Sequence, residues 1–142
     1  MDGQADESEQ ARVRLQAEVA RLFVADIFAA EGLPQADAEI VASCLVRADL
    51  RGVDTHGIVR VPAYVDRLRR GLVARAPALE LRHVTSVAAH LDGGNGLGFV
   101  VATRAMEAAI GMARAHGIGL VSVRRSTHFG MAAAYLLQAI EA

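Results

Sequence analysis

The sequence predicts a mixed α/β fold, of the α+β kind, because its hydrophobic period changes along the chain. In the first half, apolar residues recur every three or four positions, as they do on helices. Near the middle, two short segments follow the two-residue period of strands. The predicted order is three helices, two strands, and then a helix, a strand and a helix, which suits helices layered on a sheet.

Three helices are predicted in the first half. The first runs from Ser8 to Glu31 and stops at Gly32, where a C-cap needs a residue that can take positive φ. The second covers residues 38–52, and its apolar stripe comprises Ile40, Val41, Cys44, Leu45 and Ala48. The third covers residues 61–72 and tolerates Pro62 in its first turn.

Residues 79–84 and 86–94 are predicted to be strands joined by a turn. The run 118–123 is largely apolar, so we expect a strand that is buried on both faces.

Two further helices are predicted around this third strand. The first spans Gly98 to His116, with Asn95 as a plausible N-cap and Gly117 ending it. The second covers residues 131–142 after a turn.

The composition limits the partners and the compartment. The net charge of -1 gives no electrostatic footprint for nucleic acid or an anionic membrane. The acidic, polar start lacks the basic region and apolar core of a signal peptide, and no apolar run of membrane-spanning length follows. We therefore expect a cytoplasmic protein without nucleic-acid or membrane partners.

Several chemistries are excluded by what the chain lacks. Cys44 is the one cysteine, so disulfides and CxxC metal sites within the chain are impossible, and we expect no metal site. All 15 basic residues are arginines, which excludes a Schiff-base lysine and a Walker P-loop.

The glycine-rich stretch Asp92–Gly98 does not fit a dinucleotide-binding loop. Gly94 and Gly96 supply the first pair of G-x-G-x-x-G, but Phe99 occupies the third position. We interpret the stretch as a strand-to-helix turn that uses the conformational freedom of glycine.

Two of the five histidines are candidates for a site. His83, His90 and His116 lie within short strands or at a helix end, where a structural role suffices. His56 and His128 each adjoin a glycine-containing break, where side chains can point into a cleft.

His56 has polar neighbours at four-residue steps. If the segment is helical, His56, Arg60 and Tyr64 line one face. If Pro62 instead marks the first helical turn, His56 and Arg60 lie on the incoming loop, and the positive end of the helix points toward whatever they bind. A third interpretation is a solvated helix face, with Arg60 paired to Asp54 or Asp66.

These side chains suit one reaction class. A guanidinium holds a carboxylate through two parallel hydrogen bonds, which orients a small acid. An imidazole can take a proton from an alcohol or give one to a ketone near neutral pH. Together they suit oxidation of a 2-hydroxy acid, with a cofactor to accept the hydride.

Three segments, residues 49–72, 91–110 and 117–135, closely resemble the malate and L-lactate dehydrogenase family of the second type. This family also includes ureidoglycolate and sulfolactate dehydrogenases, and reductases of cyclic imino acids and 2-keto sugar acids. The resemblance covers nearly the whole chain from about Ala17 onward, in the same order.

The resemblance implies an oxidoreductase that uses NAD or NADP and transfers a hydride to or from a small 2-hydroxy or 2-keto acid. It implies a fold that is not Rossmann, built around a largely antiparallel sheet, and a homodimer. It also implies that His56 and His128 are catalytic, either one serving as the acid/base. Arg60 matches the arginine that binds the substrate carboxylate, Tyr64 an aromatic position near it, and Thr55 a hydroxyl position that is serine in many members.

Family members run to more than twice this length, with most cofactor contacts downstream of Ala142. We therefore expect residues 1–16 to be a polar extension with the start of a helix. Residues 17–142 are expected to be the N-terminal part of a dehydrogenase-like domain, an incomplete family fold. The alternative is a truncated, inactive fragment or an association module of that family. The substrate acid, and the choice between NAD and NADP, do not follow from the sequence.

Overall fold

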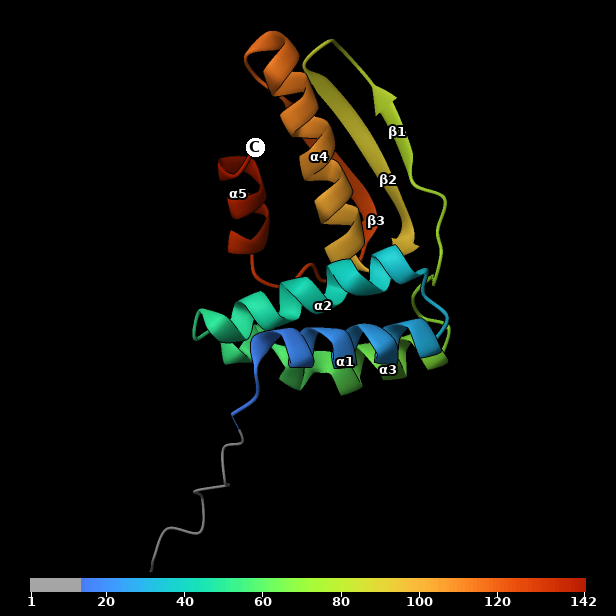
Figure 1. Cartoon of the computed structure of the whole chain (residues 1–142). Helices are drawn as coiled ribbons and strands as arrows, with labels where there is room; N and C mark the ends of the chain where they lie inside the picture. The colour runs from blue at the N-terminus through green and yellow to red at the C-terminus, as the bar shows by residue number, and fades with distance from the viewer. Residues whose placement is uncertain (1–13) are drawn as a thin grey trace, which may run out of the picture.

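The structure is a computed structural model and describes residues 14–142. Within that range it has five α-helices and a three-stranded sheet, so the mixed α/β class is confirmed (Figure 1). The helices are α1 (Ala17–Ala30), α2 (Gln35–Leu50), α3 (Val61–Arg69), α4 (Gly98–His116) and α5 (Ala133–Ile140). The strands are β1 (Glu80–His83), β2 (Ala88–Gly96) and β3 (Leu120–Ser126), and two 3-10 turns, Asp54–His56 and Ile58–Arg60, precede α3.

The main core lies where the first three helices meet the start of α4. Helices α1, α2 and α3 gather at one end of the molecule, while the sheet and α4 rise from them (Figure 1). Phe28 of α1, Leu45 of α2 and Leu68 of α3 are fully buried, together with Phe99 at the start of α4. Burying side chains of this size stabilises the fold by about 1.5–3 kcal/mol each.

The sheet has the order β1-β2-β3 and is mixed. β1 pairs antiparallel with β2, and β2 pairs parallel with β3. The parallel pair is possible because α4 forms the long crossover that such a connection requires. α4 also covers one face of the sheet, where Leu91 packs against Val101 and Ala105 (Figure 1). A largely antiparallel sheet was expected, but these three strands provide one pair of each kind.

The expected burial of the third strand is wrong. Leu120 is 64% exposed and Val123 is 42% exposed. β3 is an edge strand in the described part of the chain, so its apolar residues have one strand partner and partial cover from α4.

Several predicted helix ends are confirmed and others shift. Gly32 and Gly117 have positive φ after α1 and α4, as predicted. The predicted start at Ser8 lies outside the described residues, and residues 14–16 are not helical, so α1 begins at Ala17. The second helix starts earlier than predicted, directly after Pro34.

Asn95 is not the N-cap of α4. The cap is Leu97, whereas Asn95 lies within the last residues of β2 and has a left-handed φ of 61°. Its side-chain amide donates to the Leu72 carbonyl at 2.9 Å, so it ties the strand end to the segment after α3.

The glycine-rich stretch is a tightly packed end of β2, which confirms its structural interpretation. A Cβ on Gly94 would lie 2.9 Å from Pro77 Cβ, and one on Gly96 would lie 2.6 Å from Pro77 Cγ. These glycines allow the backbone to approach Pro77, so their Cα faces offer no open cradle for a phosphate.

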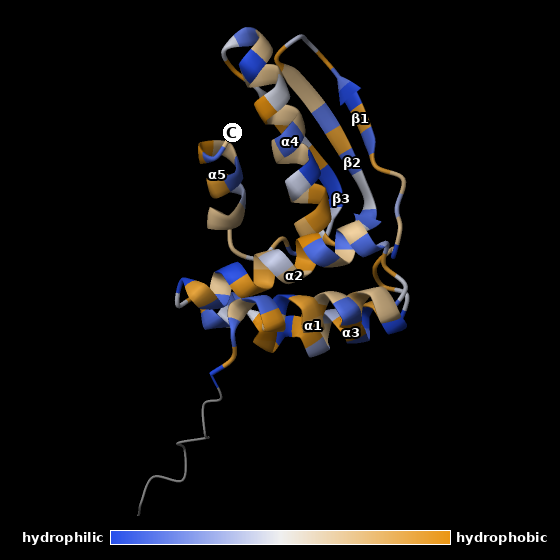
Figure 2. Cartoon of the chain, in the orientation of Figure 1, coloured by the Kyte–Doolittle hydropathy of each residue, from blue (hydrophilic) through white to orange (hydrophobic). Residues whose placement is uncertain are grey.

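The described helices carry both hydrophobic and hydrophilic residues (Figure 2), and some of the hydrophobic ones are exposed. Val19, Leu22 and Phe23 of α1 are 55%, 50% and 65% exposed. Within residues 14–142, none of the helices combines the length and apolar character needed to span a bilayer.

Candidate active site

Two distant segments meet beside the core. The 3-10 turns before α3 carry His56, and the loop between β3 and α5 carries His128. The two imidazole rings stack with their centroids 5.5 Å apart and their planes 30° apart. Tyr64 joins them, with its hydroxyl oxygen 2.9 Å from His128 Nδ1.

The turns that carry His56 are held by an acid at the end of α2. A carboxylate oxygen of Asp49 accepts the Ile58 N–H at 2.8 Å. A Cβ on Gly57 would lie 1.7 Å from Asp49 Oδ1, so this position has room only for glycine. Asp49 could not be selected from the sequence, because a contact nine residues along the chain depends on the fold of the intervening turns.

Of the predicted geometries, the one with an incoming loop is found. Pro62 lies in the first turn of α3, so His56 and Arg60 precede that helix. Within residues 14–142, Arg60 pairs with neither Asp54 nor Asp66, and Asp66 bonds Arg70 at 3.3 Å instead. The ion pair that a solvated helix face would require is therefore not formed.

Tyr64 is the buried member of the group, at 4% exposure. Its ring meets Phe99 edge to face, with centroids 5.1 Å apart and planes at 82°. This packing fixes the direction of the hydroxyl toward His128.

Thr55 and Arg60 lie at the margin of the group and are exposed. Thr55 Oγ1 lies 3.0 Å from His56 Nδ1. Within the described chain the Arg60 guanidinium bonds none of the other candidate side chains, although its charge acts on His128. The structure thus brings His56, Tyr64 and His128 together, with Thr55 on His56 and Arg60 nearby.

The loop that carries His128 is docked on the start of α4. Thr127 Oγ1 accepts the Gly98 N–H at 3.0 Å. Gly130 takes a left-handed φ of 75°, and a Cβ there would lie 2.4 Å from Phe99 Cε1. The Gly130 N–H donates to His128 Nδ1 at 3.2 Å. Gly130 is not among the predicted site residues, although its place two residues after a candidate histidine was a visible signal.

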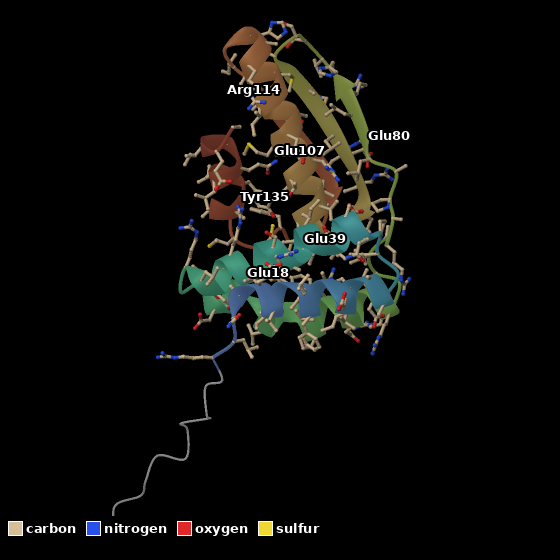
Figure 3. The ribbon with its side chains drawn as sticks, viewed as in Figure 1. Glu18, Glu39, Glu80, Glu107, Arg114 and Tyr135 are labelled. Atoms are coloured by element: carbon tan, nitrogen blue, oxygen red, sulfur yellow. The ribbon has the colours of Figure 1, made fainter. Side chains whose placement is uncertain are left out.

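Tyr135 on α5 (Figure 3) contacts the same loop. Its hydroxyl donates to the Phe129 carbonyl. Burial, and then the neighbouring Cys44, raises the pKa of Tyr135 well above its usual range, so the phenol keeps its proton and remains a donor.

His128 is held toward its neutral form. Desolvation lowers its pKa, and repulsion by His56 and Arg60 lowers it further. Since the lowered pKa belongs to the folded state, the unfolded chain binds more protons as the pH falls. The contribution to stability is present above the ordinary imidazole pKa of about 6.5 and is lost as the pH falls through the lowered folded value.

Replacing His128 with glutamine should therefore make the free energy of unfolding depend less on pH in the acidic range. We expect the free energy of unfolding of the wild type to fall more steeply with decreasing pH below about 6.5 than that of His128→Gln. Urea unfolding at a series of pH values measures this slope. His116→Gln, at the exposed end of α4, is the control and should keep the wild-type slope. Identical slopes for wild type and His128→Gln would contradict the expectation.

The group can exchange a proton and orient an anion, because it combines imidazoles, a hydroxyl and a guanidinium. Within residues 14–142, no three His, Cys, Asp or Glu side chains gather closely enough to hold a metal ion.

Comparison with known proteins shows which family this chain resembles. The sequence profile of the family described as malate/L-lactate dehydrogenase matches residues 15–142. A malate dehydrogenase of Pyrococcus abyssi is 43% identical over 119 residues, which are 84% of this chain and 33% of that protein. A ureidoglycolate dehydrogenase (NAD(+)) of Escherichia coli K12 is 37% identical over 111 residues, which are 78% of this chain and 32% of that protein.

The fold agrees with these sequence matches. The solved structure of malate dehydrogenase from Pyrococcus horikoshii OT3 superposes with a TM-score of 0.89 at 39% identity, and the match covers 99% of this chain and 39% of that one. The chain spans about a third of the length of the curated relatives it matches. Since the family profile covers all but the first 14 residues, the chain belongs to the malate/L-lactate dehydrogenase family.

Proposed function

We propose that the chain carries the substrate-binding and proton-exchanging part of a dehydrogenase. The reaction is hydride transfer between a nicotinamide cofactor, NAD or NADP, and a small 2-hydroxy or 2-keto acid. The observation that carries this proposal is the pairing of His56 and His128 at 5.5 Å, close to the charge of Arg60. The relatives named for malate and ureidoglycolate support the substrate class.

In the oxidation direction, Arg60 holds the substrate carboxylate through its fork of N–H donors. The C2–H bond breaks with its electron pair, the hydroxyl proton passes to an imidazole, and the C–O bond becomes a carbonyl. The cofactor supplies the hydride acceptor, because no side chain can take a hydride. The glycine-rich end of β2 is too tightly packed to cradle its phosphates, so no residue of that stretch is assigned to it.

We further propose that residues 17–142 form the N-terminal part of a dehydrogenase-like domain that is not Rossmann and is incomplete within this chain. The coverage of about a third of each relative supports this division. The working form is proposed to be a cytoplasmic homodimer.

Arg60→Lys should weaken substrate binding. A lysine keeps the charge but loses the bidentate fork, so we expect KM for the 2-keto acid to rise roughly tenfold with a smaller change in kcat. Steady-state kinetics over a range of 2-keto acid concentrations measures both. Arg70→Lys is the matched control, because Arg70 is exposed at the end of α3 and pairs with Asp66. An unchanged KM in Arg60→Lys would make Arg60 structural.

A second candidate function is association without catalysis by the 142-residue chain. It is favoured by a group of exposed apolar side chains on one helix, α1, where Val19, Leu22 and Phe23 are 55%, 50% and 65% exposed. Groups of exposed apolar side chains mark interaction surfaces.

One pair of measurements separates the two functions. The absorbance of NADH or NADPH is followed with a panel of 2-keto acids, and sedimentation at several concentrations gives the mass of the assembly. Cofactor oxidation that depends on the keto acid supports the dehydrogenase. Concentration-dependent assembly without turnover supports association.

A further inference from the structure

The Nδ1 atom of His128 has two neighbours that can form hydrogen bonds. The Tyr64 hydroxyl oxygen lies 2.9 Å away, and the Gly130 backbone nitrogen lies 3.2 Å away with its N–H directed at Nδ1. One contact comes from α3 and the other from the loop of His128 itself. Nδ1 is therefore held from both halves of the site.

These neighbours differ in what they can do. A hydroxyl can donate or accept, whereas a backbone N–H can only donate. Because the Gly130 N–H points at Nδ1, that nitrogen must present its lone pair. In a neutral imidazole the proton then sits on Nε2. The Tyr64 hydroxyl is left to act as a second donor to Nδ1.

His56 has no such restriction. Its Nδ1 lies 3.0 Å from Thr55 Oγ1, and a hydroxyl can donate to a neutral imidazole or accept from a protonated one. His56 therefore keeps its partner in both protonation states. A protonated His128 would turn an Nδ1–H toward the Gly130 N–H and lose that hydrogen bond.

Packing holds the two groups that donate to His128 Nδ1 in place. Tyr64 is 4% exposed and its ring is set edge to face against Phe99. Gly130 is pressed against the same ring, and its left-handed φ of 75° aims its N–H back at His128. Neither donor can turn away without disturbing Phe99, which is fully buried.

We propose that Tyr64 and the Gly130 amide are positioning groups that fix His128 as a neutral imidazole with its proton on Nε2. His128 then donates a hydrogen bond to the C2 oxygen of the substrate, and His56 is the residue that gains and loses the proton. The part of this assignment that concerns substrate rests on the proposed dehydrogenase function.

With these two roles, the proton and the hydride are both accounted for over one turnover. In oxidation, the C2 hydroxyl gives its proton to His56 while the C2 hydrogen departs with its bonding electron pair, which a nicotinamide cofactor would accept. The Nε2–H of His128 stays in place and stabilises the oxygen as it becomes a carbonyl. In reduction, protonated His56 returns the proton to the oxygen.

The tautomer can be measured in the 142-residue chain without substrate or cofactor. We label the histidines with ¹⁵N and record long-range ¹H–¹⁵N correlations above the pH range in which imidazoles titrate. His56→Gln and His128→Gln assign the two ring systems by loss of their signals. His83 and His116, both exposed, serve as internal references for an imidazole that exchanges freely between tautomers.

We expect the two nitrogens of His128 to be separated more widely in shift than those of His83 and His116, with Nδ1 unprotonated. In Tyr64→Phe, which keeps the buried ring but removes one donor, the separation should shrink toward the reference values. A protonated Nδ1, or shifts equal to the references in the wild type, would overturn the proposal.

A second arm tests the role in turnover, by comparing glutamine and asparagine at each histidine. A glutamine amide nitrogen can take the place of Nε2 as a neutral donor, whereas asparagine is too short. We expect His128→Gln to retain roughly tenfold more kcat than His128→Asn, while the two variants of His56 are equally slow. Equal losses at His128 would overturn its role as a neutral donor. A wild type without turnover counts against the proposed function, and the spectra still decide the tautomer.

Discussion

We expect His56→Asn to lower kcat of the proposed dehydrogenase by roughly a hundredfold or more, because a positioned acid/base contributes about that much to proton transfer. Asparagine can form hydrogen bonds but cannot accept a proton near neutral pH. We also expect the variant to lose the part of the pH profile of kcat that follows imidazole protonation. Stopped-flow or steady-state absorbance of the reduced cofactor measures both quantities.

His83→Asn is the control for this result, since His83 lies exposed on β1 away from the paired rings. It should leave kcat and its pH profile unchanged. If His56→Asn keeps wild-type kcat while His128→Asn loses it, the proton is exchanged by His128 and the two roles are reversed. Near-normal kcat in both variants would remove the pair from the mechanism.

Gly98→Ala destabilises the fold and misplaces the loop of His128. A Cβ at this position would lie 2.3 Å from the Thr127 carbonyl oxygen and 2.4 Å from that of His128. Both atoms belong to the backbone, so the loop itself has to move. Overpacking of this kind costs about 1–3 kcal/mol, and we expect the free energy of unfolding to fall by that amount. Urea denaturation of the 142-residue chain measures it.

Gly111→Ala provides the matched control in the same helix. Among the described residues nothing lies within 4 Å of a Cβ at Gly111, and it stands within α4. Alanine favours a helix interior over glycine by about 1 kcal/mol, so this variant should be as stable as the wild type or more stable. If the two alanine variants unfold alike, the contact between Gly98 and the loop does not carry the stability assigned to it.

The parts of the fold that could be predicted are those encoded locally. The period of apolar residues located every described helix and strand, and Gly117 ended α4 where positive φ was expected. Asn95 was misassigned because its amide bonds the Leu72 carbonyl, a partner 23 residues away. The burial of β3 was misjudged because an apolar run does not show whether a strand lies inside a sheet or at its edge.

Only some residues of the candidate site could likewise be predicted from the sequence. His56, Arg60 and Tyr64 could be selected because they are close in sequence, and His128 because it adjoins a glycine-containing break; the family resemblance added Thr55. The residues that orient them could not be selected, since their roles arise from contacts made by folding. Asp49 reaches the Ile58 N–H across the 3-10 turns, and Gly130 meets a ring from the start of α4.

The Phe99 ring contacts both of the residues that bond His128 Nδ1. Tyr64 packs edge to face with it, and Gly130 lies directly against it. These positions share one space, so mutational effects at them should not be additive. An enlargement at Gly130 demands a smaller ring at 99, and a smaller ring there loosens Tyr64. Over evolutionary time the residues at these three positions should therefore change together, so the geometry around His128 depends on a side chain that has no polar atom of its own.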